Sequence, residues 1–269
     1  MLDLRNPQPL LAQLCTIAAE AGGAILEVYG RDFAVHYKDD RSPLTEADEV
    51  SQRIIVERLH ALDDSVPVLS EESAPPEPAT RRSWARFWLV DPLDGTKEFL
   101  KRNGEFTVNI ALIEGHRPVL GVVQTPVGGE LACAWRGGGA WIARPGEKAR
   151  HVKTRKRATP IVVAGSRSHA SAHESELLAR LGHCAKMPLG SSLKFLRIAA
   201  AEADLYIRLG PTSEWDTGAG QCVLEEAGGV VLDMKGEPLR YNTRDSLLNP
   251  DFVAIGDPSA DWSALFAGL

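Results

Sequence analysis

The N-terminal part of the chain combines two long amphipathic stretches with short apolar runs. Residues 9–29 form an apolar stretch that polar residues interrupt, which predicts an amphipathic helix. Apolar residues between Ala47 and Leu62 recur at helical spacing and predict a second helix. We expect this helix to begin at Thr45, whose hydroxyl can cap it while Asp48 lies three residues later, as in a capping box.

Short apolar runs separated by turn residues predict strands through the rest of the first half. A strand over 67–69 ends near Glu71, and a proline-rich loop follows at 75–78. The other predicted strands of this half are 87–90, 107–113, 119–124, 131–134 and 140–143. We expect an antiparallel sheet with helices on one side.

The pattern changes after the basic run Arg150–Arg157, which has no interleaved aromatic residues and is predicted to be a solvated linker. Strands and helices then alternate as in an α/β layer. The predicted strands are 161–164, 184–187, 205–207 and 230–232, and the predicted helices are 173–181, 192–202 and 217–227. We therefore divide the chain into an α+β half, 1–157, and an α/β half, 158–269, within one compact unit.

Composition narrows the possible functions. The net charge of −6 over 269 residues argues against non-specific binding of nucleic acid polymers, but allows a small anionic substrate. The four cysteines are widely spaced, so zinc binding or redox use is not expected. No stretch approaches the roughly 20 apolar residues of a membrane span. We expect a cytoplasmic monomer or homodimer; contact with the inner membrane face stays open.

The sharpest chemical signal is the segment Asp-Pro-Leu-Asp-Gly-Thr at 91–96, which directly follows an apolar strand. Buried acids as close as Asp91 and Asp94 repel one another unless a cation or a proton neutralises them. Gly95 opens backbone amides beside them, as a phosphate site requires. The alternative is an ordinary turn in which an aspartate caps a helix.

Two further acids could complete a cation site. Glu71 ends a strand just upstream of the turn, although Glu-Glu pairs such as Glu71-Glu72 are usually solvated. Asp216 precedes a predicted helix and could simply cap it. Oxygen ligands beside a phosphate-sized nest suggest magnesium and a phosphate ester.

These three motifs resemble those of the lithium-sensitive, magnesium-dependent phosphatase superfamily that includes inositol monophosphatase and fructose-1,6-bisphosphatase. Within it the chain most resembles the bacterial 3′(2′),5′-bisphosphate nucleotidases. The segments closest to that group are Lys97-Glu-Phe99, Ser166-Arg-Ser-His169, Gly190–Phe195 and Leu205–Thr212. Gly218 departs from the family, which more often has alanine there. The resemblance implies a layered α/β/α/β/α sandwich.

The resemblance also implies two or three magnesium ions, held mainly by the first half. Glu71, Asp91 and the Leu93 carbonyl would hold one ion, and Asp91, Asp94 and Asp216 a second. Two such ions can polarise phosphoryl oxygens and lower the pKa of a water molecule. The expected catalytic residues are Glu71 and the water-orienting pair of Thr96 and Asp48. For Asp48 the capping box is the alternative role.

The second half would select the substrate. Ser191 and Ser192 could receive a second phosphate or a ribose, and Lys194 and Arg208 could add positive charge. Each could equally have a plain structural or surface role, and His169 is expected to be a loop histidine. The complete set of expected substrate contacts is Glu71, Leu93, Asp94, Gly95, Thr96, Ser191, Ser192, Lys194, Arg208 and Asp216.

The resemblance implies hydrolysis of the 3′-phosphate of adenosine 3′,5′-bisphosphate to AMP, in support of sulfate assimilation, and use of the sulfonated relative is left open. An inositol monophosphatase-like sugar phosphatase is the closest alternative. A second is a non-catalytic regulator that binds nucleotide or metal. The joint presence of the acids and Thr96 argues against a regulator.

Overall fold

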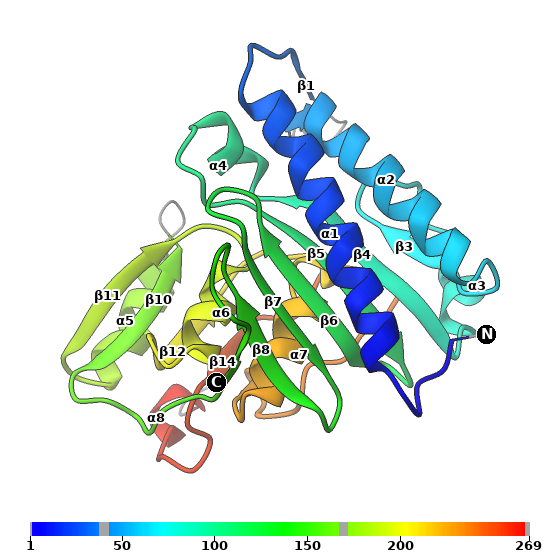
Figure 1. The fold of residues 1–269 in the computed structure, drawn as a ribbon. Helices are drawn as coiled ribbons and strands as arrows, with labels where there is room; N and C mark the ends of the chain where they lie inside the picture. Colours follow the sequence, from blue (N-terminus) through cyan, green and yellow to red (C-terminus); the bar gives the residue numbers. More distant parts are fainter. Residues whose placement is uncertain (1, 38–42, 167–171, 267–269) are drawn as a thin grey trace.

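The computed structural model describes residues 2–37, 43–166 and 172–266. Helices and sheets are stacked in alternating layers (Figure 1). The order is helices α1 and α2, a seven-stranded sheet, helices α6 and α7, a five-stranded sheet, and helices α5 and α8. This arrangement confirms the expected α/β/α/β/α sandwich.

The two outer helices form as expected. Helices α1 (Gln8–Tyr29) and α2 (Glu46–Leu62) lie side by side across one face of the larger sheet (Figure 1). At the start of α2 the Thr45 amide donates to Asp48 Oδ2 over 2.8 Å, and the Thr45 hydroxyl accepts from the Ala47 amide. The predicted capping box is therefore confirmed.

Helix α1 corrects one expectation. Among the described residues it alone is long and apolar enough to cross a membrane, which the sequence reasoning had excluded for every stretch. One face of α1 is nevertheless packed inside the protein, because Leu14, Ile17 and Ile25 are each at most 1% exposed. A buried core helix passes the same length and hydropathy test, so the helix is weak evidence for a span.

The larger sheet has the strand order β3-β4-β5-β6-β7-β8-β9. All neighbours are antiparallel except β3 and β4, which are parallel. The strands are β3 (Val68–Ser70), β4 (Arg86–Asp94), β5 (Thr107–Glu114), β6 (Arg117–Thr125), β7 (Glu130–Trp135), β8 (Gly139–Ala143) and β9 (Arg150–Val152). Two short helices, α3 (Pro78–Arg82) and α4 (Thr96–Leu100), flank β4 in sequence. A separate two-stranded sheet pairs β1 (Val35–Tyr37) with β2 (Pro43–Thr45).

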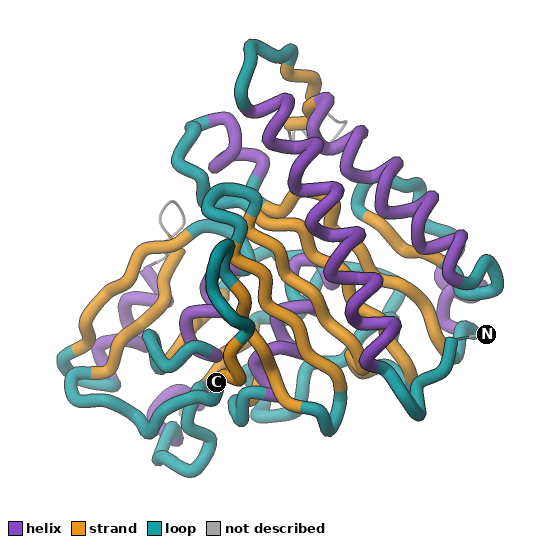
Figure 2. Tube along the Cα trace, in the orientation of Figure 1, coloured by secondary structure: helices purple, strands orange, loops and turns teal. Residues whose placement is uncertain are grey.

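The smaller sheet has the order β11-β10-β12-β14-β13 and lies apart from the larger one (Figure 2). Its strands are β10 (Ile161–Ser166), β11 (Cys184–Leu189), β12 (Leu205–Arg208), β13 (Val230–Asp233) and β14 (Phe252–Ile255). Strand β14 runs antiparallel to both neighbours. The helices of this half are α5 (Ala172–Arg180), α6 (Leu193–Ala199), the 3-10 helix η1 (Glu214–Asp216), α7 (Gly218–Glu226) and α8 (Ser263–Phe266).

The basic run is only in part the solvated linker that was predicted: Arg150, His151, Lys153, Lys156 and Arg157 are exposed, but the run also contains a strand and a buried contact. Its first three residues form β9, the last strand of the larger sheet, and Val152 is 2% exposed. The Arg155 guanidinium donates to both carboxylate oxygens of Asp204, each over 2.9 Å. Asp204 is buried, so this ion pair fastens the connection between the two sheets.

Helix α7 packs closely against β6 because both elements are small at the contact. A Cβ atom at Gly121 would lie 2.6 Å from Cys222 Cβ and 2.7 Å from the Ala219 carbonyl. The largest buried cluster contains side chains from both halves, among them Leu89 and Ala111 with Phe195 and Val223. The two halves therefore share a core; their division into metal and substrate parts stays a prediction.

Candidate active site

The acidic segment forms a bulged strand end where the sequence predicted a turn. Asp91 pairs with Asn109 and Asp94 with Thr107, so three steps along β4 match two along β5. Residues three apart in a regular strand point to opposite faces, but the extra residue of a bulge brings Asp91 and Asp94 to one side. Gly95 then adopts a left-handed conformation, φ 94° and ψ 42°, and ends the strand.

The sheet and η1 bring Glu71, Asp91 and Asp216 together. Carboxylate oxygens of all three lie within 4.8 Å of one another. Glu71 follows β3, the parallel neighbour of β4, and its amide donates to the Val90 carbonyl over 3.2 Å. Asp216 ends η1, where its Oδ2 accepts from the Ser213 amide over 2.9 Å. Asp216 thus takes part in a local capping box and also belongs to the acidic cluster.

The cluster is electrostatically unfavourable without a cation. Burial, and then the charges of Glu71, Asp94 and Asp216, raise the pKa of Asp91 well above its ordinary value of 3.8. Burial and the charges of Asp94 and Glu71 likewise raise the pKa of Asp216.

One oxygen of Asp91 is suited to coordinate a cation. Asp91 is 1% exposed, and its Oδ1 accepts from the Leu93 amide over 3.1 Å. Its Oδ2 is buried without a hydrogen-bond partner among the described residues. A buried carboxylate oxygen of this kind beside two further carboxylates fits a hard divalent cation.

Thr96 lies between Asp48 and the backbone of the acidic segment. Its hydroxyl is 3.4 Å from Asp48 Oδ1 and 3.5 Å from the Leu93 carbonyl oxygen. Asp48 uses its other carboxylate oxygen in the capping box with Thr45. The two roles considered for Asp48 are therefore geometrically compatible, and the Leu93 carbonyl faces this site.

Asp94 is held by a buried polar network. Ser192 Oγ is 2.8 Å from Asp94 Oδ2 and also 2.8 Å from the Asp216 carbonyl oxygen. Asn109 Nδ2 donates to Ser192 Oγ over 2.9 Å and approaches Asp94 Oδ2 at 3.4 Å. Burial raises the pKa of Asp94, while the charge of Lys194 and the Ser192 hydroxyl oppose that shift.

Ser192 is 1% exposed and caps no helix through its side chain, so its contacts connect Asp94 on β4 with the chain at Asp216. Contact between Ser192 and the substrate stays a prediction. Sequence reasoning missed Asn109, although a polar residue inside the apolar run 107–113 was a usable signal.

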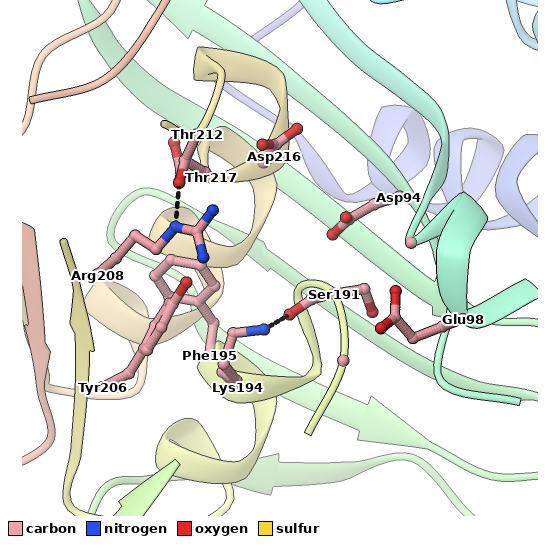
Figure 3. A pocket seen from close by; sticks show the side chains of 12 residues that line it. Asp94, Glu98, Ser191, Lys194, Phe195, Tyr206, Arg208, Thr212, Asp216 and Thr217 are labelled. Carbon is pink, nitrogen blue, oxygen red and sulfur yellow. Dashed lines mark hydrogen bonds between the residues drawn. The ribbon is translucent and has the colours of Figure 1, made fainter. Parts of the chain in front are cut away.

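A pocket opens beside Asp94 and Asp216, on the side of α6 and β12 (Figure 3). Its other lining residues are Gly95, Glu98, Gly190, Ser191, Lys194, Phe195, Tyr206, Arg208, Thr212 and Thr217. Glu98 lies on the acidic side, and burial raises its pKa. Glu98, Phe195, Tyr206 and Thr212 lie in segments that carry the family resemblance, but no role was predicted for them.

Two cationic side chains lie across the pocket from Asp94 and Glu98 (Figure 3). Lys194 is 6% exposed; its Nζ donates to the Ser191 carbonyl over 2.6 Å and lies 5.1 Å from the centre of the Tyr206 ring. Burial lowers the pKa of Lys194 to about 8, although the charge of Asp94 opposes this. Arg208 donates through Nε to Thr212 Oγ1 over 2.6 Å.

Three further observations complete the placement of the expected residues. Ser191 lines the pocket with φ 42°, and its Oγ is buried without a hydrogen-bond partner in the described part of the chain. Gly218 packs against β4, where a Cβ would come within 2.9 Å of Leu89 Cδ2. His169 lies outside the described residues.

The geometry agrees with comparisons to known proteins. The inositol monophosphatase family matches residues 6–259. The chain is 48% identical to the 3′(2′),5′-bisphosphate nucleotidase CysQ of Escherichia coli strain K12 over 245 residues, 90% of this chain and 98% of that protein. It is 36% identical to the same-named protein of Haemophilus influenzae, over 96% of each chain.

A solved structure shares the whole fold. The crystal structure of CysQ from Bacteroides thetaiotaomicron, a bacterial member of the inositol monophosphatase family, is 37% identical with a TM-score of 0.81. The match covers 94% of this chain and 99% of that one. The chain belongs to the inositol monophosphatase family.

Proposed function

We propose that this protein is a magnesium-dependent 3′(2′),5′-bisphosphate nucleotidase that hydrolyses the 3′-phosphate of adenosine 3′,5′-bisphosphate and leaves AMP. The observation on which the proposal rests is one pocket with two unlike ends. Asp94 and Asp216 border its acidic end, and Lys194 and Arg208 line the other side. A substrate with two phosphate groups matches this distribution of charge.

The acidic end would hold magnesium through Glu71, Asp91, Asp216 and the Leu93 carbonyl, with Asp94 available to a second ion. The partnerless Asp91 Oδ2 supports this, since hard divalent cations prefer carboxylate and carbonyl oxygens. When bound, magnesium supplies positive charge that polarises a phosphate ester and favours deprotonation of water. Gly95 contributes its backbone to the pocket lining, because glycine has no side chain; a Cβ there would lie 3.3 Å from Ser191 Cβ.

Thr96 and Asp48 would orient the attacking water molecule. Asp48 Oδ1 can accept the Thr96 hydroxyl proton, which leaves a lone pair of Thr96 Oγ1 directed at the hydrogen of a water. The capping box keeps the Asp48 carboxylate in place through its other oxygen. Water then attacks phosphorus directly, so the mechanism involves no covalent enzyme intermediate.

The cationic end would bind the 5′-phosphate. Lys194 Nζ and the Arg208 guanidinium both line the pocket, and the hydrogen bond from Lys194 to Ser191 sets the position of the ammonium group. Ser191 Oγ adds a buried hydroxyl without a partner among the described residues. The sulfonated relative, 3′-phosphoadenosine 5′-phosphosulfate, presents the same 3′-phosphate and an anionic 5′ group, so we include it as a substrate.

A comparison of substrates tests the proposal. Phosphate release should be measured from adenosine 3′,5′-bisphosphate and from inositol 1-phosphate under identical conditions with magnesium. The names of the two relatives, both 3′(2′),5′-bisphosphate nucleotidases, and the cationic end of the pocket support preference for the nucleotide. A clear preference for inositol 1-phosphate would instead assign the chain to the sugar phosphatases of its family.

A further inference from the structure

A buried arginine connects the segments that follow Glu71 and Asp216. Arg81 lies on α3, ten residues after Glu71, and is 1% exposed. Its Nη1 donates to Asn242 Oδ1 over 2.6 Å, and its Nη2 donates to the Asp245 carbonyl. Asn242 returns a hydrogen bond from Nδ2 to the Arg81 carbonyl over 2.5 Å. Arg81 therefore fixes α3 to a segment 161 residues away.

Asn242 also bonds to η1. The backbone amide of Asn242 donates to Glu214 Oε2 over 2.7 Å. Asn242 and Glu214 are both 0% exposed. Glu214 is the first residue of η1, and Asp216 is the last. A continuous chain of buried hydrogen bonds thus leads from Arg81 through Asn242 to the helical turn that carries Asp216.

The same distal segment holds the neighbours of Asp216 from both sides. Tyr241 Oη lies 3.1 Å from Oγ1 of Thr217, the residue that follows Asp216. Asn249 Nδ2 donates to the Ser213 carbonyl over 2.7 Å, three residues before it. The segment 241–249 therefore holds the turn 213–217 through hydrogen bonds. Arg81 connects the segment 241–249 to the part of the chain that contains Glu71.

Burial of a guanidinium is unfavourable in free energy unless its donors have hydrogen-bond acceptors. An apolar side chain could fill the same space without this requirement. The fixed fork of Arg81 can bond two acceptors at once, a side-chain oxygen and a backbone oxygen, which an apolar side chain cannot do. A rigid tie of this kind sets the relative positions of the elements it joins.

We propose that Arg81 is a positioning residue for the cation site, which holds Asp216 at the correct separation from Glu71 and Asp91. The inference rests on the proposed function only in requiring a cation at this cluster. Carboxylates that must converge on one ion depend on such outer contacts for their orientation.

Calorimetric titration of the metal-free protein with Mg²⁺ tests the inference. Arg81→Met should weaken Mg²⁺ binding about 10-fold, the low end of the effect of losing a direct outer contact, because Arg81 acts on Asp216 only through Asn242 and Glu214. Arg82→Met is the matched control: Arg82 lies next to Arg81 and pairs with Asp245 over 3.0 Å, but its side chain is 44% exposed. The control should bind Mg²⁺ like the wild type.

A second variant separates positioning from general stability. Arg81→Lys keeps the charge but cannot bond both acceptors, so its Mg²⁺ affinity should fall between those of Arg81→Met and the wild type. For both variants, saturating Mg²⁺ should restore part of the hydrolysis rate, because binding of the cation is weakened rather than abolished.

Either of two results would overturn the inference. One is wild-type Mg²⁺ affinity in a folded Arg81 variant, and the other is failure of both variants to fold, which would make Arg81 a residue of general stability. Circular dichroism at the titration temperature decides whether each variant is folded. The quantity measured is Mg²⁺ affinity, not hydrolysis. If the wild type bound Mg²⁺ but did not hydrolyse the nucleotide, the proposed function would be rejected and the inference about Arg81 would still hold.

Discussion

Asp91 occupies an electrostatically unfavourable position in the acidic cluster. It is buried, the charges of Glu71, Asp94, Asp216 and Asp48 all act on it, and one of its oxygens has no partner among the described residues. The Asp91→Asn substitution keeps the size of the side chain and removes its charge. We expect it to abolish hydrolysis and the stabilisation by Mg²⁺, while thermal stability in EDTA stays equal or rises because repulsion is relieved.

Phosphate release and thermal unfolding with and without Mg²⁺ check this expectation. Unchanged hydrolysis by the Asp91→Asn variant would contradict the role given to the acidic cluster. Loss of hydrolysis would also exclude the non-catalytic regulator, provided that the wild type is active.

Thr96 should affect the chemical step more than binding. Thr96→Val removes the hydroxyl that faces Asp48 but keeps the shape of the side chain, so we expect kcat to fall about 10²- to 10⁴-fold with little change in KM. Thr96→Ser retains the hydroxyl and is the matched control. Equal kcat values for the valine variant and the wild type would remove Thr96 from the mechanism.

Lys194 should discriminate between substrates. Lys194→Met removes the positive charge near the expected 5′-phosphate, and a charged hydrogen bond is worth about 1.5–3 kcal/mol, or roughly 10- to 100-fold. We expect kcat/KM to fall by this factor for adenosine 3′,5′-bisphosphate but much less for adenosine 3′-monophosphate. An equal decrease of kcat/KM for both substrates would show that Lys194 does not act on the 5′-phosphate.

At the scale of elements, the close contact between β6 and α7 can be tested by stability. Gly121→Ala would force a methyl group against Cys222 and Ala219, and overpacking of this kind costs about 1–3 kcal/mol. Gly23→Ala on α1 is the matched control, since nothing lies within 4 Å of its Cβ position. Alanine there should stabilise by about 0.5–1 kcal/mol. Urea unfolding measures both; a neutral Gly121→Ala would contradict the packing.

Elements with strong local signals could be predicted from the sequence. Helix α2 was found because its capping box and apolar spacing act within a few residues. Strand β9 and helix α3 were missed because they are only three and five residues long and lie in basic or proline-rich segments. The prediction of a turn at the acidic segment was wrong because pairing with β5, the next strand along the chain, extends β4 through Asp94 as a bulge.

The site could be predicted only in part for the same reason. Glu71, Asp91, Asp94 and Asp216 stood out through local motifs, and the fold brings them to one region. The network through Asn109 joins residues 83 positions apart, so no local spacing could have revealed it. Arg81, which depends on a contact across 161 positions, was equally out of reach.

For the whole molecule, the acids link stability to pH and to cations. Asp91, Asp94 and Asp216 have pKa values raised above 3.8, so the folded state binds their protons more tightly than the unfolded chain does. These acids contribute their full stabilisation at pH values below 3.8, their pKa in the unfolded chain. The stabilisation is lost as the pH rises through their higher pKa values in the folded protein. Glu214 acts in the same direction between 4.5 and its raised pKa of about 7.

Without divalent cations, Tm should therefore decrease as pH is raised from about 5 to about 8. Magnesium should offset this loss, and its stabilising effect should be largest at the higher pH, because cations compete with protons for the carboxylates. Differential scanning calorimetry in EDTA and in Mg²⁺ at both pH values provides the comparison. A Tm in EDTA that rises over this range would contradict the electrostatic description of the cluster.

We propose above all that the pocket directs the 3′-phosphate to the acidic end and the 5′-phosphate to the cationic end. Phosphorus NMR of the reaction with adenosine 3′,5′-bisphosphate tests it most directly, since the method identifies which phosphate is lost. We expect AMP and inorganic phosphate in the presence of Mg²⁺, and no reaction in EDTA. Formation of adenosine 3′-monophosphate, or an unchanged rate in EDTA, would contradict it.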